Sequence, residues 1–366
     1  MTQPRRIAAI TLVVFGTAAT AAHAQTVSAR LDSAMRVAER AGFSGVVRLE
    51  RDGVTLLEKG YGSANREKHI PFTAETVVQI GSNTKDFTAV AILQLEESGR
   101  LSQRDALAKY FPAAPADKRI ITIAQLMNHR AGFPAGIGGD VESVKRAAFI
   151  ERAMKTPLLF APGARESYSN TGFSVLAAII EQVTGMPYDA YVERNILAPI
   201  GLRRTGFLLP GFKPDDLAHG YLAAGTDAGT MIAKPHDTDG PYWSLRGNGG
   251  MLSTVGEMHA FYMELFEGTK LMKAGTRALR FDPNEPIGST HFATDPDSPT
   301  LDERIQRFSN LHETLGAITI ERIERFDNGS VEVSLKSALQ GDVQMRVMAD
   351  QQMPFLIHGI QVRVGG

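Results

Sequence analysis

The chain has 366 residues, of which 43% are hydrophobic and 22% charged, a composition typical of a soluble globular protein rather than a disordered, collagen-like or coiled-coil one. Thirty-nine basic residues nearly balance 40 acidic ones, so the charge gives no indication of a nucleic-acid partner or an anionic membrane surface. The chain has no cysteine, which excludes a disulfide scaffold, a thiolate nucleophile and a cysteine-ligated metal site.

The N-terminal residues have the pattern of a signal peptide. Arg5 and Arg6 precede an apolar stretch at 7–22, and Ala22-His23-Ala24 fits the small-x-small pattern of a cleavage site. A membrane-spanning helix is the alternative, but the apolar stretch is short for a bilayer. We therefore predict that residues 1–24 are removed and that the mature protein is periplasmic or secreted, with no stable membrane anchor.

The next part of the chain predicts a mixture of helices and strands. Two β-like runs flank Asp52-Gly53, which is typical of a hairpin turn, and a further β-like run passes directly into a helical pattern at Ser82. The helical pattern that begins there ends at Gly99. We predict helices at 28–41, 82–99, 120–129 and 172–183, and strands at 46–50, 54–58 and 76–80.

The remainder divides into an irregular excursion, a linker and a small C-terminal unit. Residues 210–243 are rich in Gly, Asp and Pro, and long irregular segments of this kind are often functional. We predict a main domain at 25–280, a proline-rich linker at 281–300 and a small α+β module at 301–366. Within that module we predict a helix at 302–314 and antiparallel strands at 317–326, 331–337, 343–348 and 357–364.

The tetrapeptide Ser82-Asn83-Thr84-Lys85 stands where a predicted strand passes into a predicted helix. A serine at a helix start lies at the positive end of the helix dipole, and a lysine three residues later lies on the same face. In a buried site the lysine loses its charge, and its neutral amine can take the serine proton. The pattern predicts a Ser–Lys nucleophile; the alternative is an N-cap serine beside a solvent-facing lysine.

A second short motif, Tyr168-Ser169-Asn170, is the only Tyr-x-Asn sequence in the chain. It directly precedes an apolar helical pattern. A tyrosine can relay a proton between nucleophile, base and leaving group, and an asparagine amide can hold a substrate carbonyl. The alternative is a capped helix start with Tyr168 as a half-buried aromatic residue.

The two motifs together resemble the serine β-lactamase and penicillin-binding-protein superfamily, and in particular the class C β-lactamase-related esterases and D-alanyl-D-alanine peptidases. The resemblance covers about residues 28–280. It implies an α+β fold of two lobes, an antiparallel sheet with flanking helices beside an all-helical lobe. Further similar stretches are Leu126–Gly132, Pro162–Phe173, Ile179–Gly185, Pro199–Leu202 and Gly249–Thr254.

The resemblance also assigns roles to individual residues. It implies Ser82 as the acyl-accepting nucleophile, Lys85 as its base, and Tyr168 with Asn170 as the second catalytic element. Gly249 and Gly250 would form a backbone turn beside the substrate. The substrate would be a small molecule or peptide with a reactive carbonyl, namely an ester, a β-lactam or a D-amino-acid peptide.

One element of the family pattern is missing. A third motif, Lys-Thr-Gly or His-x-Gly, normally stands on an inner strand that supplies an oxyanion donor, and neither pattern occurs in this chain. Lys273-Ala274-Gly275 is the nearest match but lies in a predicted helix and turn, while His358-Gly359 lies in a predicted strand of the C-terminal module. Loss of an oxyanion donor costs roughly 10²–10³ in rate. A relative that binds a cell-wall ligand, an acyl ligand or a partner protein without turnover is therefore the alternative to a hydrolase.

Other polar residues carry weaker signals. His129 is expected to be a structural imidazole near the lobe interface rather than an acid–base group. The histidines lack metal-ligand spacing with carboxylates, and the glycine-rich stretch at 247–250 lacks the context of a phosphate-binding loop. We therefore predict neither a metal nor a cofactor.

Overall fold

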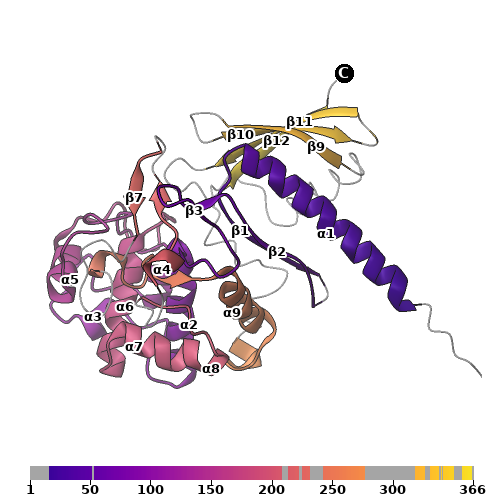
Figure 1. Cartoon of the computed structure of the whole chain (residues 1–366). Coiled ribbons are helices and arrows are strands. Elements are labelled where there is room, and N and C mark those ends of the chain that lie inside the picture. Colours follow the sequence, from indigo (N-terminus) through magenta and orange to yellow (C-terminus); the bar gives the residue numbers. More distant parts are fainter. Residues whose placement is uncertain are drawn as a thin grey trace, which may run out of the picture.

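The computed structural model describes residues 16–51, 53–207, 213–221, 225–230, 242–276, 318–325, 330–337, 339, 341–349 and 357–364. Figure 1 shows α2–α8 gathered into one lobe, with α1, the hairpin β1–β2 and a four-stranded sheet on the other side. The helices are α1 (Gly16–Arg40), α2 (Thr84–Glu97), α3 (Leu107–Tyr110), α4 (Ile123–Met127), α5 (Arg146–Lys155), α6 (Asn170–Thr184), α7 (Tyr188–Val192), α8 (Ala198–Ile200) and α9 (Val255–Glu267).

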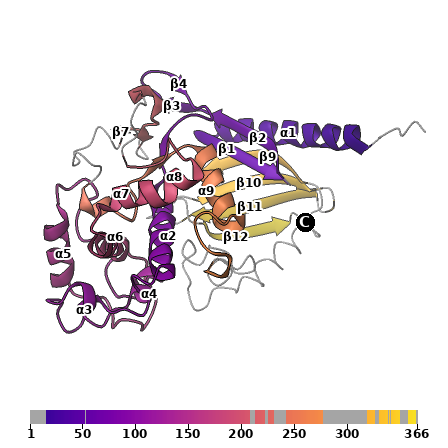
Figure 2. The same cartoon turned by 90° about the horizontal axis from the view of Figure 1, so that it is seen from below.

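The first two strands of the chain, β1 (Gly45–Arg51) and β2 (Val54–Tyr61), form the predicted hairpin and pair antiparallel. Within the described residues these two strands pair only with each other. The helix α1 contacts β2, and α9 contacts β1; Figure 2 shows the two helices on opposite sides of the strands. The short strands between β2 and α9 are β3 (Ser63–Asn65), β4 (Ile70–Pro71), β5 (Val78–Gln79), β6 (Gly220–Tyr221), β7 (Asp227–Gly229) and β8 (Leu252–Ser253).

The C-terminal strands form one antiparallel sheet in the order β12-β11-β10-β9. They are β9 (Ile318–Arg325), β10 (Ser330–Ser337), β11 (Gly341–Ala349) and β12 (Ile357–Val364), so all four predicted strands are confirmed. The predicted linker at 281–300 and the predicted helix at 302–314 lie outside the described residues. The sheet touches the rest of the chain where β9 contacts α1.

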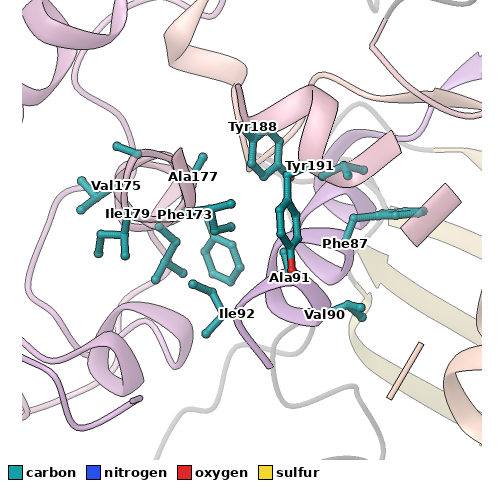
Figure 3. Packing of buried hydrophobic residues seen from close by; sticks show 14 of the residues in the cluster. Phe87, Val90, Ala91, Ile92, Phe173, Val175, Ala177, Ile179, Tyr188 and Tyr191 are labelled. Carbon is teal, nitrogen blue, oxygen red and sulfur yellow. The ribbon is translucent and has the colours of Figure 1, made fainter. Parts of the chain in front are cut away.

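The core of the helical lobe is built around α2 and α6. Ten consecutive residues of α6, from Thr171 to Ile180, are buried, which is the pattern of a helix surrounded by protein on all sides. Ser169 caps its first turn by accepting a hydrogen bond from the Gly172 N–H, and Gly185 ends it with φ +72°. Figure 3 shows side chains of α2 and α6 packed together with Tyr188 and Tyr191 of α7. This packing fixes the start of α2 relative to the start of α6.

Three predicted elements differ from the structure. The helix predicted at 120–129 is only α4, because Thr122 forms a capping box with Gln125 and His129 has the left-handed φ of 55° that ends a helix. The strand predicted at 76–80 is reduced to β5. The first helix begins at Gly16 rather than at residue 28, so it runs across the predicted cleavage site. Among the described residues, no helix combines the length and apolar character needed to cross a bilayer.

Candidate active site

The predicted nucleophile lies in the tight turn that joins β5 to α2. Residues Gly81–Asn83 form a single 3-10 turn, and Lys85 follows in the first turn of α2. The spacing of three residues places both side chains on one face, with Lys85 Nζ 3.1 Å from Ser82 Oγ. The structure thus brings together the serine and the lysine that the sequence motif predicts.

Tyr168 reaches the same point from the loop that precedes α6. Its hydroxyl lies 2.6 Å from Ser82 Oγ. The next residue holds this loop in place, because Ser169 Oγ accepts a hydrogen bond from Gly172 N and donates one to Pro134 O. Burial raises the pKa of Tyr168 to about 12, against an opposing effect of the Ser82 hydrogen bond, so the phenol keeps its proton at neutral pH.

Lys85 is buried, with 4% of its surface exposed. Its Nζ donates hydrogen bonds to Ser82 Oγ and to Asn248 O, the latter at 2.8 Å, and lies over the Tyr168 ring at 4.7 Å. Burial lowers the pKa of Lys85 to about 7, while the negative charges of Asp86 and Asp140 act to raise it. A substantial fraction of this lysine is therefore neutral at physiological pH, as a general base requires.

The carbonyl that binds Lys85 belongs to a short segment fixed by buried hydroxyl groups. Ser174 Oγ of α6 donates to Arg246 O at 2.9 Å, and Thr88 Oγ1 of α2 donates to Gly247 O at 2.7 Å. The amide Nδ2 of Asn248 donates to Ser174 Oγ at 2.7 Å. Three successive carbonyls, at 246–248, are therefore held by side chains of the two central helices.

Sequence reasoning identified the glycine-rich turn at 247–250 but not the carbonyl of Asn248 as a partner of the lysine. One signal for it is Gly247, which has φ +77° and where a Cβ would lie only 2.7 Å from Phe173 O. Only glycine fits such a position, because both the backbone conformation and the close approach to α6 exclude a Cβ. Pairing of β5 with β8 then brings this segment beside Ser82.

The predicted substrate-binding residues belong to the two segments that contact Ser82 and Lys85. Asn170 follows Tyr168 by two residues, and its buried Oδ1 accepts no hydrogen bond from any described residue. The N–H groups of Gly249 and Gly250 both donate to Leu245 O at 3.2 Å, and the carbonyl of Gly249 accepts from Gln79 Nε2. The two glycines thus form the turn that follows Asn248, and their role toward a substrate stays a prediction.

His129 supports the tyrosine loop. Its Nδ1 accepts a hydrogen bond from Ser169 N at 3.2 Å, its carbonyl accepts from Ser167 N at 2.9 Å, and its ring lies 4.6 Å from the Tyr168 ring. These contacts on both sides of Tyr168 agree with the structural role expected for this histidine.

Comparison with known proteins identifies the family of the chain. The sequence profile of the family described as Beta-lactamase matches residues 24–296 of the chain. The chain belongs to the beta-lactamase family. A "Putative D-alanyl-D-alanine carboxypeptidase" from Escherichia coli (strain K12) is 30% identical to it over 254 residues, which cover 60% of this chain and 58% of that protein. The chain thus spans about three fifths of the length of this curated relative.

Solved structures with a similar fold agree with the α+β class predicted from the sequence. The octameric penicillin-binding protein homologue from Pyrococcus abyssi has 25% sequence identity and a TM-score of 0.59, over 91% of this chain and 72% of that one. EstCE1, described as a hydrolase with promiscuous acyltransferase activity, has 24% identity and a TM-score of 0.59, over 71% of this chain and 77% of that one. The latter similarity shows the shared fold.

The nearest sequence match to the family's third motif lies away from the nucleophile. Lys273 N donates to the carboxylate of Glu97, the last residue of α2, at 2.9 Å, and residues 274–276 are helical. Ser82 lies just before the opposite end of α2, about 20 Å from Glu97 at a rise of 1.5 Å per helical residue. His358-Gly359 belongs to β12, which pairs with β11.

One group of side chains has the spacing of metal ligands. Among the described residues, Glu67 of the turn between β3 and β4 lies beside His219 and Asp227 of the excursion that carries β6 and β7. Both ring nitrogens of His219 are engaged in hydrogen-bond contacts, Nδ1 with Asp227 at 2.8 Å and Nε2 with Asn65 at 2.9 Å. The histidine therefore links two elements of the fold and offers no lone pair to a metal without breaking one of these contacts.

Proposed function

We propose that this member of the beta-lactamase family is an exported serine hydrolase that forms an acyl-enzyme on Ser82. Its substrate is an ester, a β-lactam or a D-amino-acid peptide. The observation that carries the proposal is the triangle of Ser82, Lys85 and Tyr168, closed by contacts of 2.6 and 3.1 Å around a buried lysine. The name of the Escherichia coli relative supports the peptide class, and EstCE1 supports the broader class of acyl transfer.

In the first half-reaction the neutral amine of Lys85 takes the proton of Ser82 Oγ, directly or through the Tyr168 hydroxyl. The serine oxygen forms a bond to the carbonyl carbon, and the carbonyl π electrons move to its oxygen. When the carbonyl re-forms, the bond to the leaving group breaks, and Tyr168 gives the leaving group a proton that Lys85 replaces. The products are the acyl-enzyme and the protonated leaving group, with Lys85 neutral again.

In the second half-reaction a water molecule takes the place of the serine. Lys85 accepts the water proton through Tyr168, the oxygen bonds to the acyl carbon, and the bond to Ser82 Oγ breaks as that oxygen regains a proton. Asn170 lies two residues from Tyr168, and its side-chain amide N–H groups are suited to hold a substrate carbonyl. Asn170 would therefore orient the substrate rather than take part in proton transfer.

The test is covalent labelling with a fluorophosphonate, which transfers its phosphonyl group to an activated serine and releases fluoride. We expect one adduct, mapped to Ser82 by peptide mass spectrometry and absent from Ser82→Ala. Ser98→Ala is the matched control. Ser98 follows the C-terminal end of α2, and its hydroxyl donates hydrogen bonds to backbone carbonyls. Failure of Ser82 to react between pH 6 and 9 would rule out the proposed nucleophile.

Turnover separates the hydrolase from the alternative. Hydrolysis of 4-nitrophenyl acetate that Ser82→Ala abolishes supports the enzyme, whereas a stable Ser82 adduct without turnover supports a binding protein that acylates once. Export is tested by mass spectrometry of the protein recovered from the periplasm or medium of the expressing cells. We expect a mature chain that begins at Gln25.

A further inference from the structure

The turn whose carbonyl binds Lys85 is held weakly by its own backbone. The N–H groups of Asn248, Gly249 and Gly250 all donate to one oxygen, Leu245 O, at 3.4, 3.2 and 3.2 Å. These distances exceed the usual value of about 2.9–3.0 Å, and three donors share a carbonyl oxygen that has only two lone pairs. Two of the three residues are glycines, which have no side chain to fix their conformation. The direction of the Asn248 carbonyl toward Lys85 therefore depends on contacts outside the backbone of the turn.

The side chain of Asn248 provides such contacts. It is buried, with 1% of its surface exposed, and its Nδ2 donates to Ser174 Oγ and to Ser244 O, both at 2.7 Å. Each hydrogen of the amide thus has a partner, and the side chain is tied to α6 on one side and to its own turn on the other. Because the side chain and the carbonyl belong to one residue, fixing the side chain restricts rotation of the carbonyl that binds Lys85.

Ser174 connects this turn to the helix that also positions the tyrosine. Its side chain is fully buried in α6, and its hydroxyl accepts from Asn248 Nδ2 while donating to Arg246 O at 2.9 Å. One oxygen atom therefore holds the residue that binds Lys85 and the carbonyl two residues before it. The loop that carries Tyr168 leads directly into the same helix. The helix α6 thus fixes one partner of the Ser–Lys pair at its start and the other through Ser174.

We infer that Ser174 and the side chain of Asn248 are positioning residues, which hold the Asn248 carbonyl against Lys85 Nζ so that the amine faces Ser82. The inference rests on the proposed function and extends it to two side chains that take no part in proton transfer. An ammonium ion gains more from a carbonyl acceptor than a neutral amine does, because charge-assisted hydrogen bonds are the stronger ones. Displacement of the carbonyl should therefore misdirect the amine and also lower the pKa of Lys85.

The experiment measures how fast a fluorophosphonate labels Ser82 as a function of pH, between about pH 5.5 and 9. The variants are Ser174→Ala and Asn248→Ala, the second of which keeps the backbone carbonyl and removes its side-chain anchor. We expect the plateau rate at high pH to fall about three- to tenfold and the midpoint to move to lower pH by about half a unit. A purely structural role would reduce the folded, reactive fraction and leave the midpoint unchanged.

The charged and titratable groups that act on Lys85 are the same in these variants as in the wild type. They are Asp86 and Asp140, whose charges raise the pKa of Lys85, and Tyr168, whose ring lies 4.7 Å from Lys85 Nζ. A change in the midpoint therefore reports the position of the Asn248 carbonyl. Ser174→Cys keeps a weak donor and acceptor, so its rate and midpoint should lie between those of Ser174→Ala and the wild type.

Ser253→Ala is the matched control for loss of a buried serine hydroxyl. Ser253 is as fully buried as Ser174, and its hydroxyl also contacts one side chain and one carbonyl, Thr205 Oγ1 at 2.7 Å and Thr254 O at 3.2 Å. We expect this control to keep the wild-type midpoint and a rate within about twofold of the wild type, because its hydroxyl does not hold the turn that binds Lys85.

The double variant tests whether Ser174 and Asn248 act through their shared hydrogen bond. Mutations of two groups in direct contact are not additive, so the double variant should lose clearly less rate than the product of the two single losses. Losses that multiply in full would show two independent effects and would contradict a common positioning role.

Three further outcomes would overturn the inference while Ser82 still reacts, which leaves the hydrolase proposal intact. They are an unchanged midpoint in both single variants, a shift to higher pH, and the same shift in Ser253→Ala. If Ser82 does not react in the wild type, the hydrolase proposal fails, and NMR titration of isotope-labelled lysine, assigned with Lys85→Met, still measures the pKa of Lys85. An equal pKa in the wild type and Ser174→Ala would then refute the positioning role directly.

Discussion

Lys85 and Lys118 are almost equally buried, with 4% and 3% of their surfaces exposed. Lys118 Nζ lies 2.9 Å from the carboxylate of Asp117, a charged partner that stabilises an ammonium ion. The two hydrogen-bond acceptors of Lys85 are a hydroxyl and a backbone carbonyl, both uncharged. Burial without a directly paired carboxylate favours the neutral amine. Burial makes a lysine a candidate base only where no directly paired carboxylate stabilises its ammonium form.

The strongest test of this comparison removes each lysine in turn. We expect Lys85→Met to reduce kcat/KM for 4-nitrophenyl acetate by about 10³-fold, since general-base catalysis contributes 10²–10⁴. We expect Lys118→Met to stay within about threefold of the wild type, because it removes only a lysine paired with the half-exposed Asp117. Circular dichroism checks that both variants are folded. Equal losses in the two variants would show that the effect of Lys85 is structural.

Removal of the Tyr168 hydroxyl is expected to give the next largest loss of activity. Tyr168→Phe removes the hydroxyl 2.6 Å from Ser82 Oγ but keeps the ring that lies over Lys85. We expect a fall of about 10² in kcat/KM, from loss of the proton relay to the leaving group. Tyr110→Phe is the matched control, because Tyr110 is buried and its hydroxyl bonds to Asp105 instead. Esters with a good leaving group should lose less than amides in Tyr168→Phe, and equal losses would contradict the relay.

Local spacing explains which part of the site was predictable. A serine and a lysine three residues apart on one helix must share a face, so their contact follows from the motif alone. The contact of Lys85 with Asn248 O joins residues 163 positions apart and uses a backbone carbonyl, which every residue type carries. No residue pattern identifies such a partner, although the glycine required at 247 indicates that the chain passes close to α6 there.

The same difference between local and long-range signals applies to the fold. The β1–β2 hairpin and the four C-terminal strands follow from alternation and turn residues, which are local signals. The helix predicted at 120–129 is too long because its apolar pattern continues past the point where His129 takes a left-handed conformation. That conformation is set by contacts with Ser167 and Ser169, about 40 residues further along the chain, which periodicity does not reveal.

The smallest expected effect tests the charge that acts on Lys85 from α2 itself. Activity should rise with pH, with a midpoint near 7, as Lys85 loses its proton. The negative charge of Asp86 favours the ammonium form, so Asp86→Asn should lower the pKa of Lys85 and move this midpoint to lower pH, by about one unit. The asparagine can still accept the hydrogen bond from Tyr262 Oη, which lies 2.7 Å from Asp86 in the wild type.

A second aspartate provides the control for that shift. Asp105 accepts a hydrogen bond from Tyr110 Oη at 2.6 Å, so it forms the same kind of Asp–Tyr pair, but it bonds to the exposed Lys109 instead of standing beside Lys85. Asp105→Asn should therefore leave the pH–rate midpoint where it is in the wild type. A shift to higher pH in Asp86→Asn, or the same shift in both variants, would contradict a direct electrostatic effect on Lys85. A shift confined to Asp86→Asn would show that the base is tuned by its nearest carboxylate and not by burial alone.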